Sequence, residues 1–253
     1  MKDIFYNEDK VNIDFGVFFG KGVFETINWQ EGPILFTEHI NRLKNGMKVL
    51  GIEAFNEDEL IKALTMKEYK NKAVKITVTD NNIIITDRDI PYKEEDYEKG
   101  FNLNTSKVIR NSTSKLTYIK SICYYENIME KSNSINSGYN DCLFLNEDGN
   151  ITETSSANIF FVDYNNKIVT PKIQDGLLSG IIRKWVIDNF NVNEKSINMK
   201  DIVNYKEAFI TNSLVGIMPV NLIDSIQFNN KYIHQIREEY EEAKGKLGGN
   251  IKW

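Results

Sequence analysis

Short runs in which apolar and polar residues alternate, each closed by a polar turn, restrict the fold of this chain most. Residues 73–79 alternate as a half-buried strand does, the Asn81–Asn82 pair makes a turn, and residues 83–86 form a second β-branched run. Runs with helical spacing stand between such segments, as at residues 37–50, which end at Gly51. A chain that switches between these two periods predicts a mixed fold of helices and strands.

The same patterns predict an element order for the whole chain. The first half is expected to contain a hairpin of residues 17–29 and 34–36, helices 37–50 and 57–67, and strands 73–79, 83–86 and 103–109. The second half is expected to contain helices 120–132, 180–190 and 233–246, a short helix from 199, and strands 142–145, 151–154, 157–162, 167–170, 192–197, 208–211 and 218–222. A polar, Ser-rich run predicts the domain boundary: a small α/β domain at 1–107, a link at 108–114 and a larger, β-rich domain at 115–253.

The composition excludes several classes of protein. The 253 residues, 41% hydrophobic and 26% charged, are typical of a globular chain of one or two domains. No apolar run reaches the roughly 18 residues that a membrane helix needs, and the first ten residues lack the apolar stretch of a signal peptide. A net charge of −5 gives no overall attraction to nucleic acid or to an anionic membrane. We therefore expect a cytoplasmic protein with neither nucleic acid nor a membrane as its partner.

Histidine and cysteine are scarce, which limits the chemistry available to the chain. The sequence contains two of each: His39, His234, Cys123 and Cys142. These residues cannot build a His-rich or Cys-rich metal site, and two cysteines cannot form a disulfide framework. We expect no metal, and an enzyme with this sequence would depend on something other than imidazole or thiol chemistry.

Lys120 and Glu153 are the two side chains with the clearest catalytic potential. Lys120 lies between Ile119 and Ile122 at the predicted start of a helix, where apolar neighbours can desolvate the amine and lower its pKa. Glu153 lies in an alternating strand, and a carboxylate on the inner face of a sheet needs a cationic partner. Taken alone, each is more often an ordinary surface residue.

Three other positions carry donors that suit an anion. Gly180 begins a predicted helix, and the amides at a helix N-terminus bind phosphate. Ser213 adds a hydroxyl after a predicted strand, although the same residues also suit a plain turn. Arg42 lies on an amphipathic helix, where a surface ion pair is the usual role. Each of these signals is weak when it is taken separately.

The order and spacing of these residues identify a family. The series consists of Gly22–Thr26, Glu38–Leu43, Ile119–Ser121 with Tyr125, Ile151–Glu153 with Ala157–Phe160, Ser179–Arg183, and Thr211–Ser213 with Pro219–Val220. This series resembles the class IV aminotransferase-like family of pyridoxal-phosphate enzymes and covers nearly the whole chain. The resemblance implies a two-domain α+β, or α/β, architecture of fold type IV, similar to D-amino acid aminotransferase. It also implies a homodimer that acts on a small-molecule amino substrate.

The resemblance gives each candidate residue a role with pyridoxal 5′-phosphate. Lys120 matches the lysine that bonds to the cofactor aldehyde and then moves protons at the substrate carbon. Glu153 matches the carboxylate that pairs with the pyridine nitrogen, and Tyr125 matches the tyrosine near the phenolic oxygen. The groups matching the phosphate site are Arg42, the backbone of Ile181 and Ile182, and Ser213.

Two features favour the 4-amino-4-deoxychorismate lyase branch, which forms 4-aminobenzoate and pyruvate for folate biosynthesis. The Asn212–Ser213 pair resembles the lyases, whereas branched-chain enzymes favour Gly-Thr there. The chain also turns directly after Asp80, where the aminotransferases usually carry a longer loop with arginine, and Arg88 on the next strand need not replace it. Two alternatives stay open: an aminotransferase acting on D-amino or branched-chain amino acids, and a non-catalytic relative that kept the fold. The presence of both Lys120 and Glu153 argues against the second.

Overall fold

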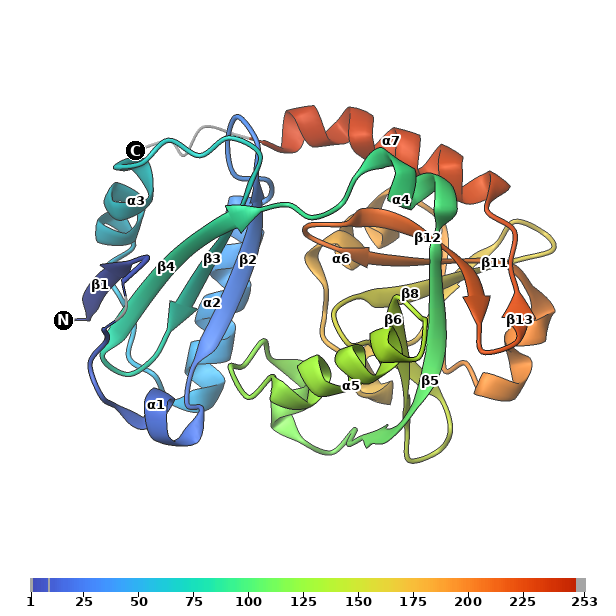
Figure 1. Cartoon of the computed structure of the whole chain (residues 1–253), viewed down its shortest axis with the longest axis horizontal. Coiled ribbons are helices and arrows are strands. Elements are labelled where there is room, and N and C mark those ends of the chain that lie inside the picture. Colours follow the sequence, from blue (N-terminus) through green and yellow to red (C-terminus); the bar gives the residue numbers. More distant parts are fainter. Residues whose placement is uncertain (1, 9, 249–253) are drawn as a thin grey trace. The chain divides into compact units, whose positions relative to one another are not determined.

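The chain forms two compact units in a computed structural model that describes residues 2–8 and 10–248 (Figure 1). Unit 1 comprises Met1–Pro91, Ile119–Tyr124 and Ala243–Trp253, and unit 2 comprises Tyr92–Tyr118 and Tyr125–Glu242. In the described part of the chain, no helix is both long and apolar enough to cross a membrane.

This division corrects the boundary predicted at residues 108–114. Strand β5 (Phe101–Arg110) runs parallel to both β12 and β6 of unit 2, so the chain enters that unit at Tyr92. The expected link therefore lies inside unit 2, while residues 119–124 return to unit 1. A polar, Ser-rich composition marks a loop, but the unit to which a loop belongs depends on strand pairing between distant segments.

Unit 1 is a four-stranded sheet, ordered β1-β4-β3-β2, with helices packed on one face. Its elements are β1 (Asp3–Tyr6), α1 (Phe15–Phe19), β2 (Val23–Trp29), α2 (Phe36–Leu50), α3 (Glu57–Thr65), β3 (Lys72–Val78) and β4 (Asn82–Asp89). The apolar stripes of α2 and α3, including Leu43 and Leu60, share one core with inward strand residues such as Ile76. The alternating residues of the three longer strands form the face opposite α2: Phe24, Thr26, Asn28, Ala73, Lys75, Thr77, Ile84, Thr86 and Arg88.

The predicted hairpin at residues 17–36 is wrong in its first strand, because residues 15–19 form the short helix α1. One oxygen of Asp14 accepts hydrogen bonds from the first amides of this helix, and Gly20 ends it in the left-handed conformation, at φ 69°. Strand β2 pairs along its length with β3, and Trp29 makes an isolated bridge with Pro33. The aromatic composition of residues 17–19 suits a strand, but the Asp14 and Gly20 caps favour a helix.

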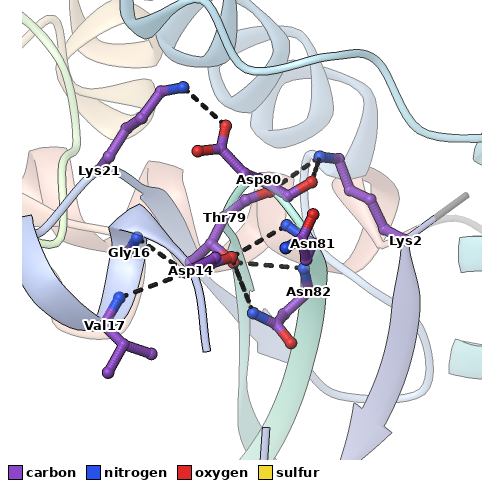
Figure 2. A network of polar contacts seen from close by, with 9 residues as sticks. All are labelled: Lys2, Asp14, Gly16, Val17, Lys21, Thr79, Asp80, Asn81 and Asn82. Atoms are coloured by element: carbon purple, nitrogen blue, oxygen red, sulfur yellow. Dashed lines mark hydrogen bonds and ion pairs between the residues drawn. The ribbon is translucent and has the colours of Figure 1, made fainter. Parts of the chain in front are cut away.

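A buried polar network fixes α1 to the turn between β3 and β4 (Figure 2). The second oxygen of Asp14 accepts hydrogen bonds from Thr79 Oγ1 at 2.5 Å and from Asn82 Nδ2 at 2.9 Å. Lys21 forms an ion pair with Asp80 at 2.7 Å. Two side chains from outside the hairpin, Asp14 and Lys21, thus hold the Thr79–Asn81 turn in place.

Unit 2 is built on a barrel. Its strands are β5, β6 (Asp141–Asn146), β7 (Ile151–Thr154), β8 (Asn158–Asp163), β9 (Ile168–Thr170), β10 (Val192–Glu194), β11 (Tyr205–Asn212), β12 (Gly216–Ile223) and β13 (Ile226–Gln227). Strands β8, β11, β12, β5, β6 and β7 are neighbours in that order, and β7 also pairs with β8, so these six strands close into a ring. Phe161, Ile210 and Met218 belong to the apolar core that the ring shares.

Four helices accompany the barrel: α4 (Glu94–Lys99), α5 (Tyr125–Asn136), α6 (Ile181–Asn189) and α7 (Lys231–Leu247) (Figure 1). Short 3-10 turns cover Lys115–Tyr118, Ile173–Asp175 and Met199–Asn204. The buried carboxylate of Glu207 accepts hydrogen bonds from the first amides of α7, those of Tyr232 at 2.8 Å and Ile233 at 3.0 Å. The predicted mixture of helices and strands is confirmed, while β1 and α4 were not predicted because both are short.

Candidate functional site

Lys120 lies on an extended segment of unit 1, which corrects the prediction that it begins a helix. The amide of Phe24 donates to the Lys120 carbonyl at 2.9 Å, and the amide of Ile122 donates to the Gly22 carbonyl at 3.0 Å. This pairing with β2 replaces the local helical bonds, and α5 begins only at Tyr125. The Lys120 Nζ atom lies 4.6 Å from the centre of the Phe24 ring, so aromatic carbon surrounds part of the amine.

Gly22 makes this pairing possible. A Cβ atom at this position would lie 2.7 Å from Ile122 Cδ1 and 3.0 Å from the Val78 carbonyl oxygen. A larger residue would displace the Ile122 side chain and crowd the Val78 carbonyl. The Gly22–Thr26 motif therefore contributes to the position of the lysine.

Arg42 belongs to a buried charge cluster behind β2. Its Nε and Nη2 atoms donate to the two oxygens of Glu25, both at 2.7 Å, and His39 Nδ1 lies 2.6 Å from Glu25 Oε2. Burial raises the pKa of Glu25, but the positive charge and hydrogen bonds of Arg42, together with His39, outweigh it and bring the pKa to about 2. The pKa of His39 is lowered by burial and by the charges of Arg42 and Lys120, against the opposing effect of Glu25. The cluster thus fixes the Arg42 guanidinium in a two-point ion pair, near the charge of Lys120.

Two cations on the face opposite α2 were not predicted as site residues. Lys75 Nζ lies 4.5 Å from the centre of the Phe24 ring, the ring that also contacts Lys120. Arg88 is a diagonal neighbour of Lys75 across β3 and β4, because Lys75 pairs with Thr86. Both side chains are exposed, and neither has a carboxylate within ion-pair distance among the described residues. Although Lys75 as a whole is exposed, partial burial by nearby protein atoms and then the charge of Arg88 lower its pKa.

Glu153 lies where β7 and β8 close the barrel of unit 2. It pairs with Asn158 across the two strands, and its Oε2 atom accepts a hydrogen bond from the Leu178 amide at 3.1 Å. Asn158 Nδ2 in turn donates to the Leu178 carbonyl at 2.8 Å. The carboxylate is half-buried, and the Leu178 amide orients it.

The first amides of α6 are open. Gly180 precedes the helix without a side-chain cap, and in the described part of the chain the amides of Ile181 and Ile182 have no hydrogen-bond acceptor. A Cβ atom on Gly180 would lie 1.9 Å from Asn158 Oδ1, so only glycine allows the helix to start this close to β8. The geometry leaves a positive helix end next to the strand that pairs with Glu153.

Ser213 and Tyr125 reach the same part of unit 2 from other elements. Ser213 lies in the turn after β11, in which Asn212 Oδ1 accepts from the Leu214 amide at 2.9 Å and Asn212 Nδ2 donates to the Ser156 carbonyl at 3.2 Å. Tyr125 is the first residue of α5, and its side chain is exposed. Asn212 thus attaches the turn that carries Ser213 to the β7–β8 turn that follows Glu153.

The predicted site residues fall into two groups. In unit 1, the charges of Lys120 and Arg42 both act on His39. In unit 2, the elements next to the β7–β8 turn carry the other predicted residues: Glu153, Tyr125, Ser213, Ile181 and Ile182. Sequence reasoning missed the role of Glu25 with Arg42. The signal that could have shown it is a glutamate in phase with the buried Val23 and Ile27 of the same strand.

Comparison with known proteins gives one consistent family. Residues 22–223 match the family described as Amino-transferase class IV. A "Probable branched-chain-amino-acid aminotransferase" from Rickettsia felis is 31% identical over 89% of this chain and 86% of its own length. An aminodeoxychorismate lyase from Bacillus subtilis is 26% identical over 86% of this chain and 83% of its own. A Legionella pneumophila structure named "Putative 4-amino-4-deoxychorismate lyase" is 27% identical, with a TM-score of 0.81 over 94% of this chain and 98% of that one.

Proposed function

The chain belongs to the aminotransferase class IV family, and we propose that within it this enzyme is a 4-amino-4-deoxychorismate lyase that forms 4-aminobenzoate and pyruvate. Enzymes of this family depend on pyridoxal 5′-phosphate, and they share the mixed α and β architecture of fold type IV. Its relatives include both lyases and aminotransferases, so the choice between them rests on the residues of this chain.

The residues of unit 2 fit this cofactor. The Glu153 carboxylate is oriented by the Leu178 amide, and a carboxylate is the group that pairs with a protonated ring nitrogen. The open amides at the start of α6 suit a phosphate, and the glycine at 180 leaves room beside Asn158. Thr211 Oγ1, on the strand paired with Asn158, is buried and has no hydrogen-bond partner among the described residues. When bound, pyridoxal phosphate supplies an aldehyde for amines and a ring that withdraws electrons.

In the proposed reaction Lys120 takes the proton from the ring carbon that bears the substrate amine. The bond from the substrate ring to the enolpyruvyl oxygen then breaks, the ring becomes aromatic, and the released enolpyruvate gains a proton to become pyruvate. With the cofactor bound, Glu153 would pair with the protonated ring nitrogen, and Tyr125 would lie near the phenolic oxygen. The phosphate would be held by Arg42, the amides of Ile181 and Ile182, and Ser213.

The observation that carries the lyase proposal is a pair of exposed cations, Lys75 and Arg88, on the sheet face that carries Phe24. Lys75 and Arg88 share a face with the Phe24 ring that Lys120 contacts, and neither is paired with a carboxylate among the described residues. Aminodeoxychorismate carries two carboxylates, whereas a branched-chain amino acid carries one and an apolar side chain. The turn between β3 and β4 supports the same choice, because Thr79–Asn81 contain no arginine and Asp80 is paired with Lys21.

A product assay tests the proposal. The enzyme loaded with pyridoxal phosphate should convert aminodeoxychorismate into equal amounts of 4-aminobenzoate and pyruvate without any 2-oxo acid. Lys120→Ala should lower the rate by at least about 10³-fold, because both the bond to the cofactor and the proton transfer are lost. Lys72→Ala is the matched control, since Lys72 pairs with Asp89 at the surface. No 4-aminobenzoate, together with rapid exchange between amino acids and 2-oxo acids, would instead establish the aminotransferase.

The proposal includes a cytoplasmic homodimer. Five large apolar side chains in and next to α1 are exposed: Ile13, Phe15, Val17, Phe18 and Phe19. A contiguous apolar surface of this kind usually marks an interface between proteins. Light scattering should give twice the mass of the chain, and the mass of a single chain at micromolar concentration would contradict the dimer.

A further inference from the structure

A side chain outside the predicted set connects the elements that carry Tyr125 and Glu153. Asn127 lies two residues after Tyr125 in the first turn of α5 and is buried. Its Nδ2 atom donates to the Ser155 carbonyl at 2.7 Å, and Ser155 follows Glu153 by two residues. This single bond joins the start of the helix to the turn that ends β7.

Arg110 binds the oxygen of the Asn127 side-chain amide. Its Nη1 atom donates to Asn127 Oδ1 at 3.2 Å, and its guanidinium lies 4.0 Å from the centre of the Phe144 ring. The Nε and Nη2 atoms of Arg110 are buried and have no hydrogen-bond partner in the described part of the chain. The same Nη1 atom forms a longer ion pair with Glu126, at 3.7 Å. A guanidinium placed in this way orients the Asn127 amide, because it can only donate and therefore faces the amide oxygen.

The chemistry of this position requires both a donor and an acceptor. An asparagine side chain supplies an oxygen for Arg110 and an NH₂ group for the Ser155 carbonyl. An aspartate would keep the bond to Arg110 but would face the Ser155 carbonyl with an acceptor, and an alanine would lose both contacts. Lys131, one helical turn later, lies 3.6 Å from the buried Asp141, so α5 has a second attachment that does not depend on Asn127.

We propose that Asn127, oriented by Arg110, is a positioning residue that fixes Tyr125 and Glu153 relative to each other in the cofactor site. This inference rests on the proposed function, which assigns Tyr125 and Glu153 to opposite parts of the cofactor ring. Asn127 does not touch the reacting atoms in this account. It acts by holding α5, which carries the Tyr125 phenol, and β7, which carries the Glu153 carboxylate, in fixed positions relative to one rigid cofactor ring.

The test uses Asn127→Asp and Asn127→Ala, with Asn133→Asp and Asn133→Ala as matched controls on the same helix. Asn133 is exposed, and among the described residues its side chain bonds only to the neighbouring Glu130. Each variant is loaded with pyridoxal phosphate, and its visible band is titrated with pH. The cofactor dissociation constant is measured by tryptophan fluorescence and the melting temperature by circular dichroism.

For both Asn127 variants we expect the pH midpoint of the visible band to move by about one unit and the dissociation constant to rise about 10-fold. The Asn133 variants should match the wild type. Arg110→Lys should retain part of the effect and Arg110→Met should lose it, which gives the same test if an Asn127 variant does not fold.

The outcomes separate this inference from the proposed function. A lowered melting temperature with an unchanged pH midpoint in both Asn127 variants would show a merely structural residue and overturn the inference. A midpoint that moves equally in the Asn133 variants would also overturn it. If the wild-type protein forms no coloured product with pyridoxal phosphate that borohydride fixes, the proposed function fails, and this inference fails with it.

Discussion

Arg42 in unit 1 and the first amides of α6 in unit 2 are both assigned to the cofactor phosphate, and the structure prepares them in opposite ways. Arg42 already forms a two-point ion pair with the buried Glu25. The amides of Ile181 and Ile182 have no acceptor among the described residues, whereas the first amides of α7 are filled by Glu207. One donor group is held in place by a counter-ion, and the other is left open.

The two arrangements differ in their free-energy cost and in the changes to which they are sensitive. A buried ion pair orients a charged group, but it requires desolvation and depends on protonation of its members. Open backbone amides are neutral, so they do not titrate, and their position depends on close packing at Gly180. We therefore expect unit 1 to be sensitive to charge and pH and the α6 site to be sensitive to volume.

Glu25→Ala should have the largest effect on stability, because it leaves the Arg42 guanidinium without its buried counter-ion. Removing one partner of such a pair costs about 3–5 kcal/mol. Urea unfolding measures the loss, and Glu38→Ala, an exposed glutamate of α2, should cost less than about 1 kcal/mol. Equal losses in the two variants would mean that the cluster does not stabilise unit 1. The double variant Glu25→Ala/Arg42→Met should recover part of the stability.

Gly180→Ala should have the second largest effect, through volume alone. Its φ of −73° suits alanine, but the added Cβ would lie 1.9 Å from Asn158 Oδ1, so Asn158 must move and give up its bond to Leu178. We expect a loss of about 1–3 kcal/mol and weaker binding of pyridoxal phosphate. Gly245→Ala, in an open position of α7, should instead gain up to about 1 kcal/mol. An alanine at 180 that is tolerated as well as the one at 245 would contradict the close packing.

His39→Gln should have the smallest effect, visible only as a change in pH dependence. The folded-state pKa of His39 is lowered, mainly by burial, so below about pH 6.5 the unfolded chain binds a proton that the folded chain resists. Stability should therefore fall as pH drops through this range, and His39→Gln should flatten the fall. Urea unfolding between pH 7.5 and pH 5 measures the slope, with His234→Gln, at the other histidine of the sequence, as the control substitution.

The window of Glu25 lies lower and is separate. Its pKa is depressed to about 2, so the stability it contributes is complete above its ordinary value near 4.5 and is lost as pH falls toward 2. A wild-type slope confined to this acidic range, with none between pH 7.5 and pH 5, would show that His39 does not oppose protonation.

Local patterns predicted those elements whose buried side chains repeat along the sequence with a regular period. The alternation of residues 73–79 gave β3, and the helical spacing of residues 37–50 gave α2 with its left-handed end at Gly51. The segment of Lys120 was misjudged because its backbone partners lie on β2, far away in the sequence. No window of neighbouring residues contains that pairing.

The same distinction applies to the site. Lys120, Glu153 and the start of α6 were predicted from motif order, since each lies in a short recognisable sequence. The contacts of Glu25 with α2, and of Asn127 with Arg110 and Ser155, join separate elements and have no local signature. Sequence order thus predicts candidate groups for the chemistry, and packing shows which side chains contact their elements.

The discontinuity of unit 1 has a consequence for synthesis on the ribosome. Its sheet is encoded before residue 91, but the strand segment with Lys120 follows a first stretch of unit 2, and residues from 243 onward come last. A nascent chain that has released only its first 91 residues can form the sheet but lacks the lysine. Unit 1 therefore acquires the Lys120 amine late in synthesis. A fragment that ends at Pro91 lacks this amine, which the proposed chemistry requires.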